Sequence, residues 1–177
     1  MTRCSQAKRR NNVFRDFAAP TRVSYARILE EEASKKGIKV FYHDKGPQWG
    51  RAALGSKRVF IPTPHRFASF FTCLHEIGHI AKNHHGWDGK PEYVWEYEAF
   101  NWALEFCRRK GIRVPERTIN YERDIIAEKV REEAEGGRKK LDSVIVRFVK
   151  QGSGRDPDVA FVKKSISDDG TVTGSSA

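Results

Sequence analysis

The chain has 177 residues, of which 38% are apolar and 32% are charged, a composition typical of a globular protein with one domain-sized core. No apolar run approaches the about 18 residues that a transmembrane helix needs, so no membrane association is expected, and the basic N-terminal segment lacks the apolar centre of a secretory signal. The three cysteines, Cys4, Cys73 and Cys107, show no CxxC spacing, which argues against a disulfide framework and favours a reducing compartment, most simply the cytoplasm.

The charge is strongly basic, because 33 lysines and arginines outnumber 23 aspartates and glutamates and give a net charge of +10. Such a charge attracts nucleic acid, anionic membranes or acidic proteins, but it does not choose among them. The basic residues are spread along the chain, and several fall where helices are predicted to end, where cations interact favourably with the helix dipole. The pattern favours a solvated surface and leaves a basic partner-binding face as the alternative.

The first elements expected along the chain are one helix and two strands. A helix is predicted over 21–36, and Gly37 ends it. β-Branched and aromatic residues then predict a strand over 38–43. The segment 50–62 is predicted to contain one further strand, centred on 58–61.

Helices are predicted for most of the remaining domain. A Thr-Pro pair is typical of a helix start and predicts a helix over 64–84. Two more helices are expected over 92–109 and 115–135. The segment 141–150 fits either a helical stripe or a strand, and a helix is favoured.

This order of elements predicts an α+β fold, in which a small antiparallel sheet packs beside a helical bundle. The domain is expected to span 19–150. A flexible basic arm, 1–18, precedes it, and a disordered tail rich in Gly, Ser and Asp, 151–177, follows it.

The stretch LHEIGHIAKNHH contains an HExxH pattern on the second predicted helix. Residues four apart lie on one helical face, so His75 and His79 can offer two imidazole nitrogens to one ion, for which Zn²⁺ is well suited. Glu76 is displaced by about 100° around the helix and can reach a metal-activated water as a general base. Gly78 costs helix stability and therefore suggests a close backbone approach.

A third ligand is expected from the next helix. Glu96 lies in the middle of its apolar stripe, where a lone carboxylate is costly unless it is paired or bound to a metal. Two alternatives remain open: a salt bridge between Glu96 and a buried Arg51, and Glu98 as the ligand if the helix is rotated from this prediction.

The strand VFIP, the helix segment LHEIGH and the following ExEA segment, in this order, resemble the ImmA/IrrE family of zinc metallopeptidases over residues 38–110. The resemblance implies a zincin-like domain in which His75, His79 and Glu96 bind zinc and Glu76 is the catalytic base. Phe100 stands where that family usually has asparagine. The resemblance also implies a protein substrate, such as a helix-turn-helix transcriptional repressor of a phage or mobile element.

Other residues and functions compete with this interpretation. His84, His85 and Tyr93 flank the motif and could stabilise an oxyanion, although the two histidines are more simply a solvated helix end. Cys73 and Cys107 are expected to be buried. The rival functions are a zincin-shaped module that binds nucleic acid or an acidic protein with a non-catalytic metal site, and amide hydrolysis on a small molecule.

Overall fold

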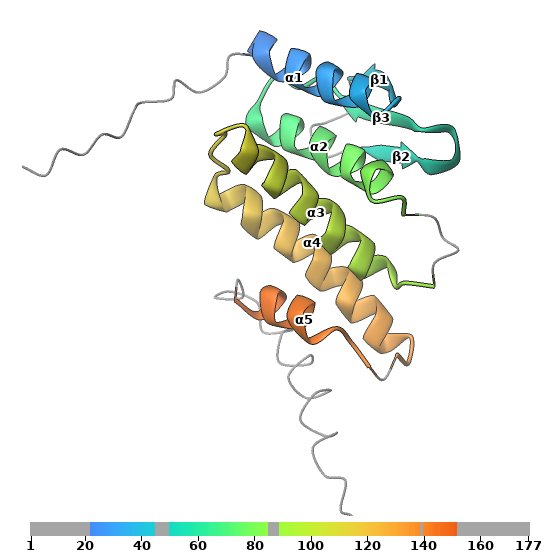
Figure 1. The fold of residues 1–177 in the computed structure, drawn as a ribbon. Helices are drawn as coiled ribbons and strands as arrows, with labels where there is room; N and C mark the ends of the chain where they lie inside the picture. Colours follow the sequence, from blue (N-terminus) through green and yellow to red (C-terminus); the bar gives the residue numbers. More distant parts are fainter. Residues whose placement is uncertain (1–21, 45–49, 85–88, 139, 152–177) are drawn as a thin grey trace, which may run out of the picture.

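The computed structural model describes residues 22–44, 50–84, 89–138 and 140–151 (Figure 1). The predicted arm and all but the first residue of the predicted tail lie outside these ranges. The elements, in chain order, are α1 (Arg22–Lys35), β1 (Lys39–His43), β2 (Arg51–Ala53), the 3-10 turn η1 (Leu54–Ser56), β3 (Arg58–Pro62), α2 (Phe67–Ala81), α3 (Glu92–Arg109), α4 (Glu116–Glu135) and α5 (Ser143–Lys150). The α+β class is confirmed, and no helix among the described residues has both the length and the apolarity to cross a bilayer.

The sheet is mixed, so the prediction of an antiparallel sheet was wrong. Its strand order is β1-β3-β2, with β1 parallel and β2 antiparallel to the central strand β3. The segment 50–62, predicted to hold one strand, instead forms a hairpin around η1, where Lys57 adopts a left-handed conformation with a φ of 48°. This reversal brings β3 back alongside β1 in the same direction.

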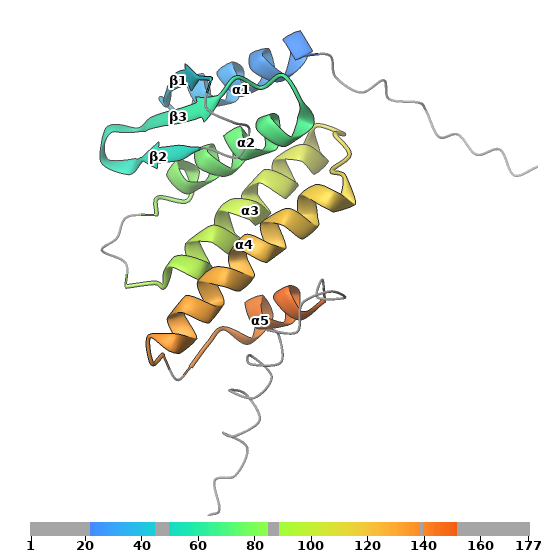
Figure 2. The same cartoon turned by 180° about the vertical axis from the view of Figure 1, so that it is seen from behind.

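The sheet has one covered face and one exposed face. Val59 and Ile61 point inward from β3 and are fully buried against the helices, while Phe60 between them is exposed. In both views of the ribbon, α2 lies between the sheet and α3, followed by α4 and then α5 (Figures 1 and 2). The helix α2 is therefore the central element of the domain.

The boundaries of α2 differ from the predicted range 64–84. The helix begins at Phe67, because Arg66 is extended and shares reciprocal capping bonds with Ser69. It ends at Ala81, and Asn83 then turns the chain with a left-handed φ of 59°. His84 consequently lies outside the helix, at a place where it can fold back onto it.

The last element, α5, is a helix, as favoured for 141–150. Asp142 caps it, because its carboxylate accepts hydrogen bonds from the backbone N–H groups of Val144 and Ile145. The Tyr93 hydroxyl on α3 accepts a 2.9 Å hydrogen bond from the Asp142 backbone N–H. This contact ties the end of the chain's described part to the helix that carries Glu96.

Candidate metal centre

Two helices bring the three predicted ligands together. His75 and His79 are one turn apart on α2, with 3.0 Å between their Nε2 atoms. Glu96 on α3 directs its carboxylate at both rings, with Oε2 2.9 Å from Nε2 of His75 and Oε1 3.5 Å from Nε2 of His79. These residues form a group whose donor atoms all lie within 4.8 Å of one another.

The spacing of the donor atoms suits a small divalent cation. Tetrahedral zinc with bonds of about 2.0 Å places its ligand atoms about 3.3 Å apart, and the observed separations of 2.9 to 3.5 Å bracket that value. His75 is buried, whereas His79 and Glu96 are partly exposed. The arrangement can therefore hold an ion with one side open to solvent.

Gly78 explains how α3 comes close enough to supply Glu96. A β-carbon added at Gly78 would lie 2.9 Å from the backbone oxygen of Ala99 and 3.2 Å from its α-carbon. The two helices thus pack backbone against backbone at this point, one turn from Glu96. The glycine between the two histidines has the packing role that its cost in a helix suggested.

The electrostatics of the group reflect its close packing. Burial favours the neutral form of Glu96, but the hydrogen bonds with His75 and His79 outweigh it and hold the pKa of Glu96 well below its usual value. Burial likewise opposes the charged form of His75, but Glu122 and Glu96 raise its pKa well above 6.5. The two carboxylates therefore favour a positive charge on His75, within the group that could hold a cation.

Glu76 lies beside the ligand group but is not part of it. Its side chain packs against Gly50, the residue before β2, where an added β-carbon would come within 2.6 Å of its Cγ and Oε1 atoms. Burial raises the pKa of Glu76, and the neighbouring histidines offset this only in part. A carboxylate with a raised pKa beside a group that could hold a metal ion is suited to accept a proton from water.

Both alternatives for the third ligand are disfavoured by the geometry. Glu98 directs its carboxylate at His84 and Lys90, 3.0 and 2.9 Å away, and not at the His75–His79 pair. Arg51 is exposed on β2, whereas the ion pairs of Glu96 are with the two histidines.

Comparisons with protein-family models, with curated proteins and with solved structures found no match. The evidence for a metal centre thus consists of the donor atoms and their spacing.

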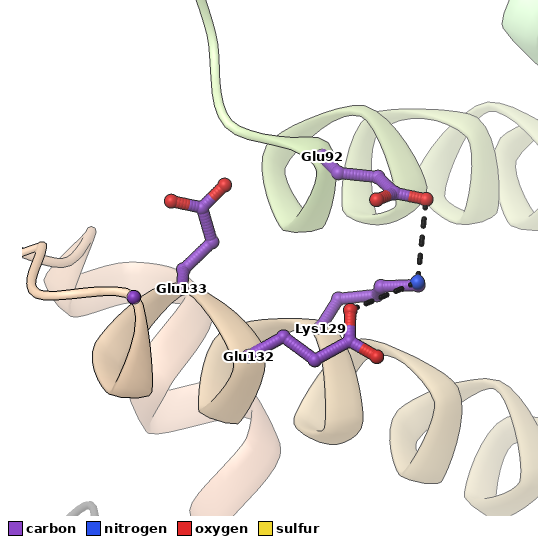
Figure 3. Close-up of a pocket in the computed structure, with 5 residues that line it drawn as sticks. Glu92, Lys129, Glu132 and Glu133 are labelled. Carbon is purple, nitrogen blue, oxygen red and sulfur yellow. Dashed lines mark hydrogen bonds and ion pairs between the residues drawn. The ribbon is translucent and has the colours of Figure 1, made fainter.

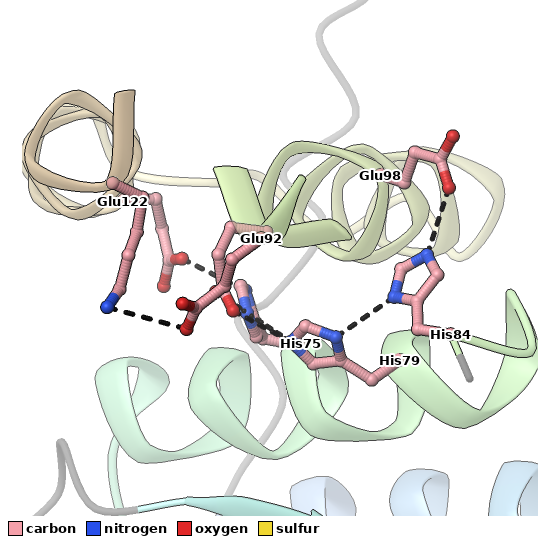
Figure 4. A network of polar contacts seen from close by, with 8 residues as sticks. His75, His79, His84, Glu92, Glu98 and Glu122 are labelled. Carbon is pink, nitrogen blue, oxygen red and sulfur yellow. Dashed lines mark hydrogen bonds and ion pairs between the residues drawn. The ribbon is translucent and has the colours of Figure 1, made fainter. Parts of the chain in front are cut away.

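Glu122 on α4 is a part of the site that the sequence analysis missed. It is only 4% exposed, and its Oε2 lies 3.0 Å from Nδ1 of His75 (Figure 4). The two atoms are at the distance of an ion pair, but they are not aligned as a hydrogen bond requires. Glu122 occupies the same helical stripe as the buried Thr118, Ile126 and Val130. The argument that singled out Glu96, a carboxylate within an apolar stripe, would also have found Glu122.

The expectation that His84 is a solvated residue was wrong. It is 1% exposed, and its ring lies between His79 and Glu98 (Figure 4). Burial and the neighbouring His79 lower its pKa, in spite of Glu98, which favours the neutral ring. His85 lies outside the described residues. Tyr93 is 2% exposed, and its hydroxyl accepts a hydrogen bond from the backbone N–H of Asp142, the residue that caps α5.

Two further features of the described part of the chain are separate from the centre. Cys73 and Cys107 are buried and unbridged, as expected. A recess of about 260 Å³ is lined by Glu92, Lys129, Glu132, Glu133 and Gly136 (Figure 3). Lys129 pairs there with Glu92 at 3.4 Å and with Glu132 at 2.9 Å, so the recess is a salt-bridged surface feature.

Proposed function

We propose that this chain is a zinc-dependent endopeptidase of the ImmA/IrrE type with a zincin-like domain. The observation that carries the proposal is the convergence of His75, His79 and Glu96, with Glu76 beside them and outside the ligand group. Two imidazoles and one carboxylate are a ligand set of hydrolytic zinc sites, which keep a fourth position for water. The HEIGH and ExEA segments supply the same assignment through their resemblance to the family.

The mechanism divides the work between the ion and the protein. Zinc, when bound, polarises the peptide carbonyl and lowers the pKa of a water. Glu76 accepts a proton from the attacking water as the new carbon–oxygen bond forms. It then donates that proton to the amine nitrogen as the carbon–nitrogen bond breaks, which returns Glu76 to its carboxylate form. Burial of Glu76 favours its role as a base, because a raised pKa makes the carboxylate a better proton acceptor.

The proposed substrate is a protein, with a helix-turn-helix transcriptional repressor of a phage or mobile element as the specific candidate from the family resemblance. The strand β3 cannot present an edge to an extended peptide, because it is paired on both sides. The edge that lies next to Glu76 is β2. A peptide would pair with β2 instead.

Two substitutions test the proposal, because one should remove hydrolysis alone and the other should remove zinc binding. Glu76→Gln should retain zinc and lose hydrolysis by roughly 10² to 10⁴-fold, whereas His75→Ala should lose the metal. Metal content is measured by atomic absorption, and hydrolysis with an unstructured protein such as casein and a fluorogenic peptide library. His65→Ala, an exposed histidine before α2, is the matched control. Equal cleavage by wild type and Glu76→Gln contradicts the peptidase, as does a wild-type protein that takes up no zinc.

A second candidate function, binding of single-stranded nucleic acid, is favoured by the exposed face of the sheet. Strand register places Phe41, Phe60 and Arg51 in one row across this face, and Lys39, Arg58 and Ala53 in the next. The two phenyl rings stack with centroids 5.1 Å apart and are 43% and 40% exposed, and the three basic residues are exposed. Bases stack on such rings while cations contact the phosphates.

This second candidate has its own test. A labelled single-stranded oligonucleotide should bind with a salt-dependent affinity, and Phe41→Ala with Phe60→Ala should weaken binding by roughly tenfold or more. Tyr121→Ala on α4 is the control, because Tyr121 is an aromatic residue of similar exposure, 39%, outside the sheet. Binding that the double substitution leaves unchanged rules out this surface, and Glu76→Gln should have no effect on it.

A further inference from the structure

We infer that His84 and Glu98 act as a positioning pair for the metal ligand His79, through a chain of three side chains that runs from the metal centre to the surface. Nδ1 of His79 lies 3.0 Å from Nδ1 of His84, and Nε2 of His84 lies 3.0 Å from Oε2 of Glu98 (Figure 4). This inference rests on the metal site of the proposed function but does not require peptidase activity.

The contacts allow one consistent assignment of hydrogens when a cation is bound. A ligating nitrogen offers its lone pair, so ligation through Nε2 of His79 leaves the hydrogen on its Nδ1. That hydrogen needs an acceptor, and Nδ1 of His84 is the atom within reach. The hydrogen of His84 must then be on its Nε2, which donates to Glu98. Through His84, Glu98 thus favours the tautomer of His79 that has its hydrogen on Nδ1 and can bind a metal through Nε2.

The structure holds His84 firmly in this position. The turn after α2 is closed by a 3.1 Å hydrogen bond from the His84 backbone N–H to the His79 carbonyl. The His84 ring packs edge-on to His79 and stacks on Trp95, with an interplanar angle of 17° to the indole. A ring that is 1% exposed and held on two sides cannot readily turn away from its hydrogen-bond partners.

The surface end of this row of side chains, Glu98, is held by the ammonium group of Lys90. Lys90 donates to both oxygens of Glu98, at 2.9 and 3.1 Å, and its side chain is 44% exposed. This contact orients the carboxylate toward His84 and keeps it ionised. A carboxylate behind an imidazole increases the basicity of that imidazole, so His84 becomes a better acceptor for the hydrogen of His79.

The two histidine ligands are therefore supported in different ways. His75 faces Glu122 directly, whereas His79 reaches Glu98 only through a second imidazole. Loss of an outer partner of a metal-bound histidine typically weakens metal affinity 10- to 100-fold. We expect His84→Ala to fall in this range and Glu98→Gln, whose amide oxygen can still accept a hydrogen bond, to lie near its lower end.

The experiment measures the zinc affinity of the full chain by competition with a chromophoric chelator. The set is wild type, His79→Ala, His84→Ala, Glu98→Gln and the control Glu105→Gln, an α3 glutamate paired with Arg108. Long-range ¹H–¹⁵N NMR of the zinc-loaded protein reports which nitrogen of His79 carries the hydrogen. In wild type and in the control we expect the hydrogen on Nδ1 of His79, in slow exchange with water. In His84→Ala we expect that hydrogen to exchange faster with water.

The outcomes separate this inference from the proposed function. Wild-type zinc affinity in both His84→Ala and Glu98→Gln, with weak binding in His79→Ala, overturns the positioning pair and leaves the metal site intact. Absence of zinc binding by wild type overturns both. Circular dichroism of the metal-free variants checks the fold, and if His84→Ala is unfolded, Glu98→Gln at the partly exposed end decides the result.

Discussion

Four glutamates around the candidate metal centre differ in their surroundings and therefore in the tasks they suit. Glu96 is held as a carboxylate by two imidazoles, and burial instead raises the pKa of Glu76 beside Gly50. Glu122 supports His75 from α4, and Glu98 supports His84 and pairs with Lys90. The first is suited to bind a cation, the second to move a proton, and the other two to orient imidazoles.

The raised pKa of His75 predicts that zinc uptake releases a proton. Without zinc, His75 stays protonated from pH 6.5 up to its raised pKa, and zinc ligation displaces that proton. Zinc affinity should therefore rise with pH below that raised pKa, by up to about tenfold per unit. Calorimetry at pH 7 in two buffers of different ionisation enthalpy should give about one proton released per zinc. Glu122→Gln should reduce that number, and a zinc affinity that does not change with pH would falsify the prediction.

The contact between Gly50 and Glu76 predicts a variant that separates metal binding from hydrolysis. The methyl group of Gly50→Ala would overlap the end of the Glu76 side chain, which can rotate away with little effect on folding stability. We expect normal zinc content and a loss of hydrolysis of roughly 10²-fold, as for a displaced general base. Gly55→Ala is the control, because that position faces open space. Full activity of Gly50→Ala means that Glu76 does not work from this position.

At the scale of elements, the packing of α2 on α3 determines the geometry of the centre. α2 carries both imidazoles, α3 carries the carboxylate, and Gly78 sets the distance between the helices. A helix interior ordinarily favours alanine over glycine by about 1 kcal/mol. At position 78 the backbone of α3 leaves no room for the methyl group of alanine.

Gly78→Ala should consequently be destabilising, in contrast to its effect in an exposed helix. The added methyl group meets the backbone of Ala99, which cannot move without displacing α3, so we expect a loss of about 1–3 kcal/mol in the free energy of unfolding. Zinc affinity should fall with it, because Glu96 moves with α3. Chemical denaturation and chelator competition measure the two effects, and a variant at least as stable as wild type contradicts this account of the packing.

Most elements were predictable from local chemistry, and the errors have identifiable physical causes. Apolar periodicity placed α3 within its observed bounds and α1 and α4 within one residue, whereas β2 has three residues and too little pattern to be recognised. The parallel pairing of β1 with β3 depends on a hairpin reversal that no local signal specifies. At the site, the helical wheel identified Glu96, but the burial of His84 follows from the left-handed turn at Asn83 and could not be predicted from helical spacing.

At the scale of the whole molecule, the centre joins three helices. His75 and His79 come from α2, Glu96 from α3 and Glu122 from α4, while α5 holds α3 through Tyr93 and Asp142. An ion bound there would be linked to most of the helical layer. Metal binding and folding are then coupled, since an unfolded chain does not hold these donors together.

This coupling predicts a metal-dependent stability. Zinc at 100 times its dissociation constant should stabilise the folded chain by about 2.7 kcal/mol, which raises the melting temperature by roughly 10 °C for a domain of this size. His79→Ala should abolish the shift, and His65→Ala should retain it. Thermal unfolding followed by circular dichroism with zinc or a chelator provides the measurement, and identical melting curves in both would sink the prediction.

The three ligands occupy a short part of the chain, because Glu96 lies only 21 positions after His75. The antiparallel pair α2 and α3 thus contains every donor atom of the proposed centre, while Glu122 and the sheet lie outside this pair. Grafted onto an unrelated helical scaffold, this pair of helices would carry the three ligands together with His84 and Glu98, and it would leave Glu122 and the sheet behind.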